Sequence, residues 1–425
     1  MQTANCKLQA CSSGHWTTRP LGHFRPGILH FAFCILTFAF FSSASAQSFF
    51  NSRGLGELTG TGDARLAAIG DPFALSTQNP GILVNLNQTS FHVSAIGAAT
   101  LGTQDGNSRL LRDIRPAAFN VATPLPFQTR LFAGINQKFG QDFDLWSDSL
   151  ADTAYRRHII GRGGIYALHA GLAKSLFDKF CIGAEYNHVM GGSRENWRFE
   201  IPHGGYTSTD TIEIDYAGNT FKVGASFQSR VFSLAGYYEP PLDLTVHRFK
   251  RVHGVVIDST RTYAISLPHS LSFAAVLNPA RRLGVNLGLT LHPWSNASIT
   301  KGDSTQSFGY KDVWRGSIGA EYDIDSLHPV RVGYSQQTWY YGSAYWGEIG
   351  RAAIRENGIH LGTSVPILKF GSLDISGELL FRESDSQGAF PPELTPPNLK
   401  EVAGRLMLTL SYSEAWAKRT RRWGY

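Results

Sequence analysis

The stretch LGVNLGLTLH, residues 283–292, sets the pattern that decides the fold. Leucine or valine stands at every odd position, and Gly, Asn, Thr or His stands between. Successive side chains of a β-strand point to opposite faces, so this alternation predicts a strand with one apolar and one small or polar face. Ten residues also match the length at which a tilted strand crosses a bilayer.

The same alternation recurs along the chain and indicates an all-β protein. Similar runs cover residues 221–228, 314–322, 373–382 and 402–412. Soluble β-sandwiches also alternate, so the strands alone leave a sandwich open as the alternative. The spacing of the connections favours a membrane barrel.

Short and long connections alternate between the predicted strands. Short turns are predicted near 124–128, 177–179, 228–230, 278–282, 323–328 and 366–370, and longer polar loops near 101–114, 140–163, 189–210, 240–261, 293–309, 340–356 and 383–400. Tight periplasmic turns and long outer loops are typical of outer-membrane barrels, whose strand number is even. Six turns and seven loops predict a 14-stranded antiparallel transmembrane β-barrel over residues 88–413.

The first 46 residues have the features of a secretory signal peptide. Residues 28–41, ILHFAFCILTFAFF, follow three basic residues and precede Ala44-Ser45-Ala46, which predicts cleavage before Gln47. An uncleaved membrane anchor is the alternative. An exported chain with no later apolar run of 18 residues can span a membrane only as a closed barrel. We therefore expect the outer membrane of a Gram-negative bacterium, with membrane lipid around the barrel.

The charge and cysteine content exclude several function classes. The predicted mature chain keeps 36 of the 39 basic residues and all 33 acidic ones, a balance that does not favour a nucleic-acid partner. Only Cys181 remains after cleavage, so no internal disulfide or cysteine metal site is expected. The histidines form no H-x-x-x-H pair, and no triad of nucleophile, base and orienting group is evident. We expect no enzyme activity, no cofactor and no metal.

Residues 47–87 precede the first predicted strand and contain the glycine-rich stretch GLGELTGTGDA, residues 54–64. No strand precedes these glycines, which argues against a nucleotide-binding loop. Fourteen strands enclose more space than their own side chains fill. We therefore predict that 47–87 form a hatch inside the lumen, where glycines allow tight turns and close backbone approach. A disordered leader is the alternative. Residues 414–425 are predicted to form a basic periplasmic tail.

The hatch sequence resembles that of the outer-membrane long-chain fatty acid transporter family. The resemblance rests on Ser52-Arg53-Gly54-Leu55-Gly56, Gly60-Thr61-Gly62-Asp63-Ala64, Asp71 and Asn79-Pro80-Gly81, in which glycine replaces the alanine of an Asn-Pro-Ala motif. The resemblance implies a fourteen-stranded barrel that transports a hydrophobic ligand and whose lumen is plugged by the hatch. Its predicted hatch residues are Gly54, Gly56, Gly60, Gly62, Asp71, Asn79, Pro80 and Gly81.

A related group fits the longer spacing between Gly62 and Asn79. Arg65-Leu66-Ala67-Ala68-Ile69-Gly70, Asp71 and Asn79-Pro80-Gly81-Ile82-Leu83 resemble the barrel that acts as a shuttle in type IX secretion. This second resemblance implies the same architecture with a protein partner. The sequence therefore supports a channel for hydrophobic or amphipathic small molecules first, and a secretion shuttle or accessory barrel second.

Two sets of side chains are candidates for the lumen and its mouth. Strand parity places these charged or histidine residues on the lumen face: His92, His169, Glu185, Lys222, Arg315, Glu321, Arg331, His360, Asp374, Glu378 and Arg405. The dense aromatic stretch 338–346 fits an interfacial girdle. Its alternative is an aromatic mouth for apolar ligands, formed by Trp339, Tyr340, Tyr341, Tyr345 and Trp346.

Overall fold

The computed structural model describes residues 48–415, except 53, 83–87, 105–106, 151–152, 178, 202–205, 253–254, 257–260, 326–327, 343–352, 369–370 and 384–399. The predicted signal peptide and most of the predicted tail lie outside these residues. Within the described part of the chain, no helix is long and apolar enough to cross a membrane.

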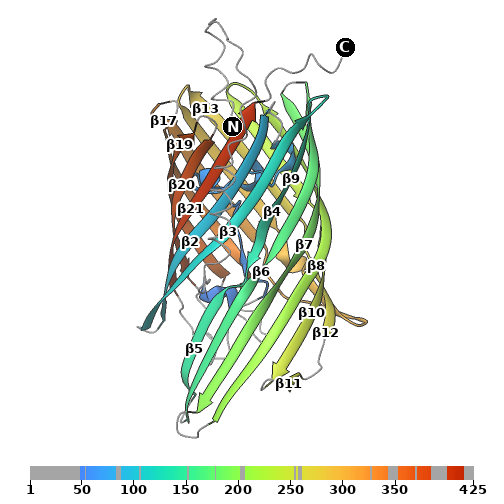
Figure 1. The fold of residues 1–425 in the computed structure, drawn as a ribbon, viewed down its shortest axis with the longest axis vertical. Coiled ribbons are helices and arrows are strands. Elements are labelled where there is room, and N and C mark those ends of the chain that lie inside the picture. Colours follow the sequence, from blue (N-terminus) through green and yellow to red (C-terminus); the bar gives the residue numbers. More distant parts are fainter. Residues whose placement is uncertain are drawn as a thin grey trace, which may run out of the picture.

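Fourteen antiparallel strands close into one barrel (Figure 1), as predicted. In chain order they are β2 (Gln88–Gln104), β3 (Asn107–Leu125), β4 (Thr129–Gly140) continued by β5 (Phe143–Leu150), β6 (Thr153–Leu176), β7 (Phe180–Ile201), β8 (Tyr206–Gln228), β9 (Phe232–Glu239) continued by β10 (Leu242–Val252), β12 (Arg261–Leu267) continued by β13 (Ser270–Ala280), β14 (Leu283–His292) continued by β15 (Ser298–Lys301), β16 (Ser304–Ser307) continued by β17 (Val313–Asp323), β18 (Pro329–Gly342), β19 (Ala353–Leu368), β20 (Gly371–Glu383) and β21 (Lys400–Ala415). The first strand pairs with the last, from Gln88↔Ala415 to Thr103↔Lys400, and this pairing closes the wall. A two-residue strand, β11 (Val255–Val256), pairs in antiparallel fashion with the end of β10.

Several predicted long loops are instead strand, and those predictions were wrong. Strands β2 and β3 stay paired as far as Gln104↔Asn107, and β7 pairs with β8 as far as Ile201↔Tyr206. The ends of β7 and β8 project well beyond most of the wall at one end of the barrel (Figure 1). The alternation continues in the outer part of β7, where Trp197, Phe199 and Ile201 stand between polar residues. The loop prediction for 189–210 therefore overlooked a strand pattern that the sequence carries. At the other end of the chain, β21 continues to Ala415, two residues into the predicted tail.

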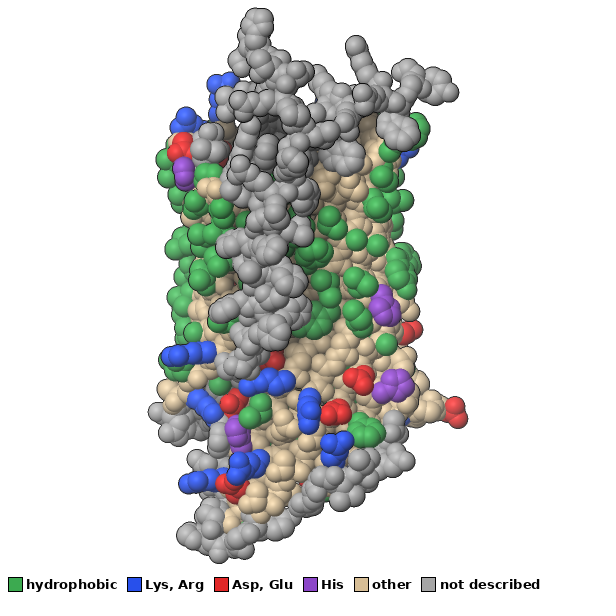
Figure 2. Space-filling model, viewed as in Figure 1, with side chains coloured by type: hydrophobic (Ala, Val, Ile, Leu, Met, Phe, Trp, Pro, Cys, Tyr) green, Lys and Arg blue, Asp and Glu red, His purple; other side chains and the backbone are tan. Residues whose placement is uncertain are grey.

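The outer surface carries a band of exposed apolar side chains that matches a bilayer. Leu172, Phe221, Phe273, Ile318 and Leu406 are among the side chains that are about half exposed on it. Figure 2 shows hydrophobic side chains over most of the height of the barrel and charged ones gathered toward the projecting end. Exposed apolar surface on this scale is stable in lipid and not in water.

Three neighbouring strands of the wall are interrupted at the same height. The gaps lie between β9 and β10, between β12 and β13, and between β14 and β15, and they hold Pro240, Pro241, Pro268 and Pro293. The paired registers end at Ser270↔Glu239 on one side and resume at Leu242↔Leu267 on the other. Proline has no N–H to donate to a neighbouring strand, which explains why the ladder stops here. We call residues 240–241, 268–269 and 293–297 the wall break.

The N-terminal segment, residues 48–82, lies within the barrel (Figure 1). It consists of short elements: η2 (Phe49–Ser52), β1 (Glu57–Leu58), α2 (Ala64–Ala67), η3 (Phe73–Leu75) and η4 (Pro80–Ile82). Strand β1 pairs with the end of β4 through Glu57↔Gly140 and Leu58↔Phe139. Helix α2 begins after Asp63, whose side chain accepts a hydrogen bond from the Arg65 amide. Elements too short to be stable alone are therefore held by the wall.

Candidate functional site

A buried charge network joins the N-terminal segment to the wall. The Glu57 carboxylate pairs with Arg382 and Arg405, and Arg382 also pairs with Glu356 and Glu401. The Arg382 side chain is fully buried. Burial by itself raises the pKa of Glu57, but the guanidinium groups of Arg382 and Arg405 outweigh it and lower this pKa to about 2. Glu57 is therefore a charged anchor at neutral pH.

Two further ion pairs hold the middle of the N-terminal segment. Arg65 Nη2 lies 2.9 Å from Glu321 Oε1, and Arg315 Nη2 lies 2.9 Å from Asp71 Oδ2. Asp71 also accepts a hydrogen bond from the Thr61 amide at 3.1 Å, across a tight loop of the segment. Behind this row, Arg331 pairs with both Glu321 and Asp374. Charged side chains of the segment thus pair with side chains of opposite charge on the wall.

The Asn79-Pro80-Gly81 turn is held by both internal and wall contacts. Asn79 Nδ2 donates to the Ala74 carbonyl at 2.8 Å, and Asn79 Oδ1 accepts from the Gly81 amide at 2.9 Å. Ser226 Oγ donates to the Gly81 carbonyl at 2.7 Å. A Cβ atom on Gly224 would lie 2.0 Å from Asn79 Oδ1, so the wall needs glycine there.

The N-terminal glycines Gly54 and Gly56 fit closely beneath an aromatic cluster. Tyr340 Oη accepts from the Leu55 amide and donates to the Gly56 carbonyl, both at 2.8 Å. Gly56 has a φ of 84°, and a Cβ there would lie 2.0 Å from the Gly140 carbonyl oxygen. Glycine is required for both reasons.

Trp339 and Tyr340 of the predicted mouth are buried rather than exposed to lipid or solvent, with 4% and 1% of their surface accessible. Tyr340 stacks on Trp294 with ring centroids 4.2 Å apart, and Trp339 packs on Phe50. Of the other predicted aromatics, the Tyr341 side chain and residues Tyr345 and Trp346 lie outside the described residues.

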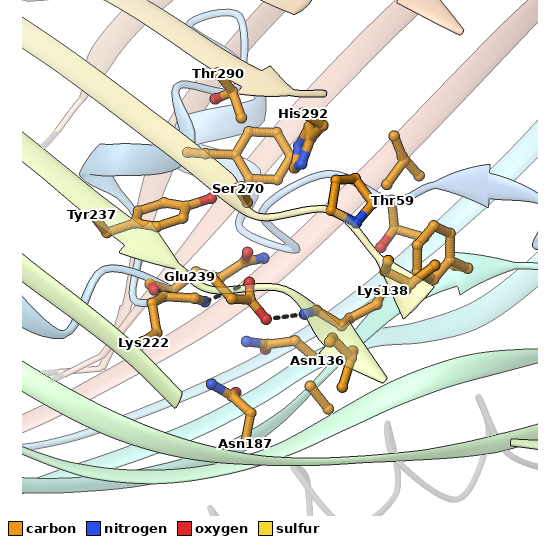
Figure 3. A pocket seen from close by; sticks show the side chains of 18 of the residues that line it. Thr59, Asn136, Lys138, Asn187, Lys222, Tyr237, Glu239, Ser270, Thr290 and His292 are labelled. Atoms are coloured by element: carbon orange, nitrogen blue, oxygen red, sulfur yellow. Dashed lines mark hydrogen bonds and ion pairs between the residues drawn. The ribbon is translucent and has the colours of Figure 1, made fainter. Parts of the chain in front are cut away.

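A cavity of about 100 Å³ lies between the N-terminal segment and the wall break (Figure 3). Leu58, Thr59, Phe73 and Gln78 of the segment line one side. The wall contributes residues from both sides of the break, including Pro240, Leu242, Leu267, Pro268, Ser270, His292 and Trp294. The cavity therefore touches the segment and the interrupted part of the wall at once.

An alternating chain of charges crosses this cavity. Lys138 pairs with Glu239, and Lys222 Nζ lies 3.9 Å from Glu239 Oε2 and 3.0 Å from Glu185 Oε1 (Figure 3 labels Lys138, Glu239 and Lys222). Lys222 also donates to the Gln78 carbonyl at 3.1 Å and lies 4.9 Å from the centre of the Tyr237 ring. Lys222 thus links the cavity to the N-terminal segment one residue before Asn79.

The remaining predicted lumen residues are spread over the interior. His169 lines the same cavity as Glu185, whereas His360 and Glu378 line a second, smaller one of about 30 Å³. His92 contacts Ser411 at 3.0 Å, in neither cavity. Within the described residues no group of three or more His, Cys, Asp and Glu side chains could hold a metal ion.

Sequence reasoning missed four of the residues that matter most here. Glu57, Lys138, Glu239 and Trp294 form the anchor and the cavity, but none was predicted as a site residue. Glu57 stands within the quoted glycine-rich stretch, and Glu239 directly precedes Pro240-Pro241. A carboxylate next to two prolines at a strand end was the available signal.

Comparison with solved structures finds the same fold at low sequence identity. The Pseudomonas putida toluene transporter TodX superposes with a TM-score of 0.56 at 13% identity, over 86% of this chain and 100% of TodX. A Pseudomonas aeruginosa FadL homologue gives 0.56 at 12% identity (87% and 99% covered), and the Ralstonia pickettii toluene transporter TbuX gives 0.54 at 14% (85% and 99%). The predicted resemblance to the fatty acid transporter barrels is confirmed at the level of fold.

No curated protein matched the sequence. The family model described as BamG matches residues 27–421, which is nearly the whole chain, and the chain therefore belongs to the BamG family.

Proposed function

We propose that this protein is an outer-membrane channel for hydrophobic or amphipathic small molecules, with its N-terminal segment acting as the hatch. The observation that carries the proposal is the cavity between that segment and the wall break. A ligand there contacts the element that would have to move and the part of the wall where three neighbouring strands are interrupted. The names of TodX and TbuX, toluene transporters with the same fold, support this choice of ligand class.

The contacts of Lys222 give the hatch a way to respond to a ligand. Lys222 binds the Gln78 carbonyl, and its other partners, Glu185 and Glu239, face the cavity. A ligand that reorders these partners weakens the hold on Gln78 and on the Asn79-Pro80-Gly81 turn that follows it. A ligand can shift the hatch only if it binds the docked and the released states with different affinity. We propose that the weakening of the Lys222–Gln78 contact supplies this difference.

A disulfide across the β1–β4 pair tests whether the hatch must move. Leu58 and Phe139 are directly paired, at a spacing that suits a disulfide. We propose Leu58→Cys with Phe139→Cys in a Cys181→Ala background, expressed in the outer membrane of a Gram-negative host. Entry of the fluorescent hydrophobe N-phenylnaphthylamine should stop on oxidation and return on reduction. The reduced form is the matched control, because it carries the same substitutions. Equal entry in both forms would exclude hatch gating.

A secretion shuttle or accessory barrel is the second candidate, favoured by the projecting strands. The ends of β7 and β8 carry a ladder of exposed charged side chains, including Arg194 paired with Glu213 at 3.5 Å and Arg198. Such a surface suits a protein partner better than a small apolar ligand. A protein that co-purifies in equal amount from the native membrane, together with no entry of the fluorescent probe, would favour this role.

A further inference from the structure

The lipid-facing surface of the barrel is hollowed across β6, β7, β8, β9 and β13. The groove has a volume of about 990 Å³ and is open toward the lipid. Leu172, Leu234 and Phe273, all about half exposed, stand along it. The outward side chains that line it are apolar except at one end, where Thr129 and Lys174 lie. The groove therefore faces the membrane, on the opposite side of the wall from the N-terminal segment.

Small outward-facing residues leave this hollow in the wall. Ala184, Ala225 and Gly236 line it on the adjacent strands β7, β8 and β9. On the inner face of the same strands, the Asn79-Pro80-Gly81 turn packs against Gly224. That contact explains the glycine on the inner face but not the small side chains on the outer face. A hollow in a surface that packs against lipid must be filled, because an empty one forfeits the van der Waals contacts of its lining.

The groove runs from the membrane surface toward the middle of the bilayer. One row of paired residues crosses it, from Lys174 through Ile182, Ala225 and Gly236 to Phe273. Lys174 lies beside the short β6–β7 turn, whereas Phe273 lies near the beginning of β13, away from the short β13–β14 turn. Four strand spacings of about 4.8 Å make the row about 19 Å long. One leaflet of a bilayer contributes about 15 Å of hydrocarbon, so the groove has the length of an acyl chain.

The end of the groove at the short turns carries positive charge. Lys174 lines the groove, and Lys179 and Arg230 are exposed in the β6–β7 and β8–β9 turns. Phe180, which also lines the groove, directly follows Lys179. Short turns of outer-membrane barrels face the periplasm, where the leaflet consists of phospholipids. Lysine and arginine side chains at that level suit a headgroup phosphate.

We propose that this groove binds one phospholipid of the periplasmic leaflet, with an acyl chain along Ala184, Ala225 and Gly236 and the headgroup phosphate at Lys174. An apolar groove with positive charge at its membrane-surface end matches an amphiphile that carries a phosphate. An apolar segment of another membrane protein could fill the hollow, but it would have no use for the basic end. The bound lipid lies outside the strands that hold the Asn79-Pro80-Gly81 turn on their inner side.

Native mass spectrometry of the purified protein in non-ionic detergent tests the headgroup with two lipids that carry the same chains. Palmitoyl-oleoyl phosphatidylglycerol should bind as a single copy. The matching diacylglycerol, which has no phosphate, should bind about fivefold more weakly, because it loses the attraction of the basic end. Equal binding of the two lipids would overturn the assignment of the phosphate to Lys174.

Variants of the groove test the place of the acyl chain. Ala225→Leu and Ala184→Leu each fill the hollow and should weaken phosphatidylglycerol binding about tenfold, because the new side chain takes the space of the lipid. Ala99→Leu is the matched control, since Ala99 is exposed on β2 and does not line the groove. Heat-dependent gel mobility shows that each variant is folded, and Ala184→Leu serves if Ala225→Leu fails to fold. Equal lipid binding in all three variants would overturn the proposal.

A charge variant and the native membrane complete the test. Lys174→Gln should remove most of the preference for phosphatidylglycerol over diacylglycerol, whereas Lys301→Gln, an exposed lysine of β15, should keep it. An unchanged preference in Lys174→Gln would overturn the headgroup contact. A protein that co-purifies with the parent and is lost from Ala225→Leu, while phosphatidylglycerol binding is retained, would give the groove to a protein partner and overturn the lipid site.

Discussion

Single glycines determine whether the N-terminal segment fits its place in the barrel. Gly56 combines a left-handed backbone with a Cβ position that the Gly140 carbonyl already occupies. Gly302 provides a matched contrast, because its φ of 56° is also left-handed but nothing lies within 4 Å of its Cβ position. A side chain at either position would cost roughly 1–2 kcal/mol in backbone strain. Only at Gly56 would it also collide with another atom.

We therefore expect Gly56→Ala to release the N-terminal segment and Gly302→Ala to leave it in place. Released segments should be cut by trypsin after Arg65 at least several-fold faster, which mass spectrometry of the N-terminal fragment measures. The heat-dependent gel mobility of the barrel should not change in either variant. Equal cleavage rates for the two variants would show that the close approach at Gly56 does not hold the segment.

Arg382 pairs with more of the buried carboxylates than any other residue of the network around Glu57. It contacts Glu57, Glu356 and Glu401 at once, which a planar group with several donors can do and a lysine ammonium cannot. Arg382→Lys should lower stability by about 2 kcal/mol, seen as a fall in melting temperature. Arg194→Lys, in an exposed pair with Glu213, should change it by less than about 0.5 kcal/mol. A similar loss in both variants would contradict this view of the network.

At the scale of elements, the membrane strands were predicted and their extensions were missed. The alternation of β14 and β20 follows directly from one lipid-facing side and one lumen-facing side. The outer part of β7 also alternates, with Trp197, Phe199 and Ile201 between polar residues, but the many polar residues of 189–210 favoured the prediction of a loop. The site was also predicted only in part. Strand parity placed Arg405 and Lys222 in the lumen. The pairing of Glu57 with Arg382, 325 residues apart, depends on how the N-terminal segment folds back into the barrel, which strand parity does not reveal.

The projecting strand ends should be dispensable for closing the barrel. Beyond Glu195↔Ile212, the β7–β8 hairpin pairs only with its neighbours β6 and β10 and forms no part of the apolar band. Replacing residues 196–211 with a short turn should leave membrane insertion and heat-dependent gel mobility intact. Loss of the folded band on the gel would mean that the extension is needed for the barrel to form. The same deletion removes Arg198 and so also tests the surface proposed for a protein partner.

At the scale of the whole molecule, opposite charges on the N-terminal segment and on the wall hold the segment inside the barrel. Those on the N-terminal segment give its docking a defined pH dependence. The pKa of Glu57 is about 2 when docked and 4.5 ordinarily, so its contribution is complete above pH 4.5 and is lost as the pH falls toward 2. Burial, with a smaller effect of Asp374, raises the pKa of Asp63 from 3.8 to about 6, so Asp63 acts in the opposite sense between pH 6 and 3.8.

Docking should therefore strengthen by about 1–2 kcal/mol from pH 7 to about 4.5, where Asp63 titrates, and weaken by about the same amount between pH 4 and 2, where Glu57 titrates, since each pKa unit corresponds to about 1.4 kcal/mol. A spin label at Ser52→Cys, in a Cys181→Ala background, reports release of the segment as increased mobility. Adding Glu57→Gln should leave the segment more weakly held at neutral pH, because its two arginines lose their carboxylate, but should remove most of the acid-dependent release. The exposed Glu213→Gln should release like the parent. If the acid-dependent release persists unchanged in the Glu57→Gln variant, then other carboxylates cause the release and Glu57 does not anchor the segment.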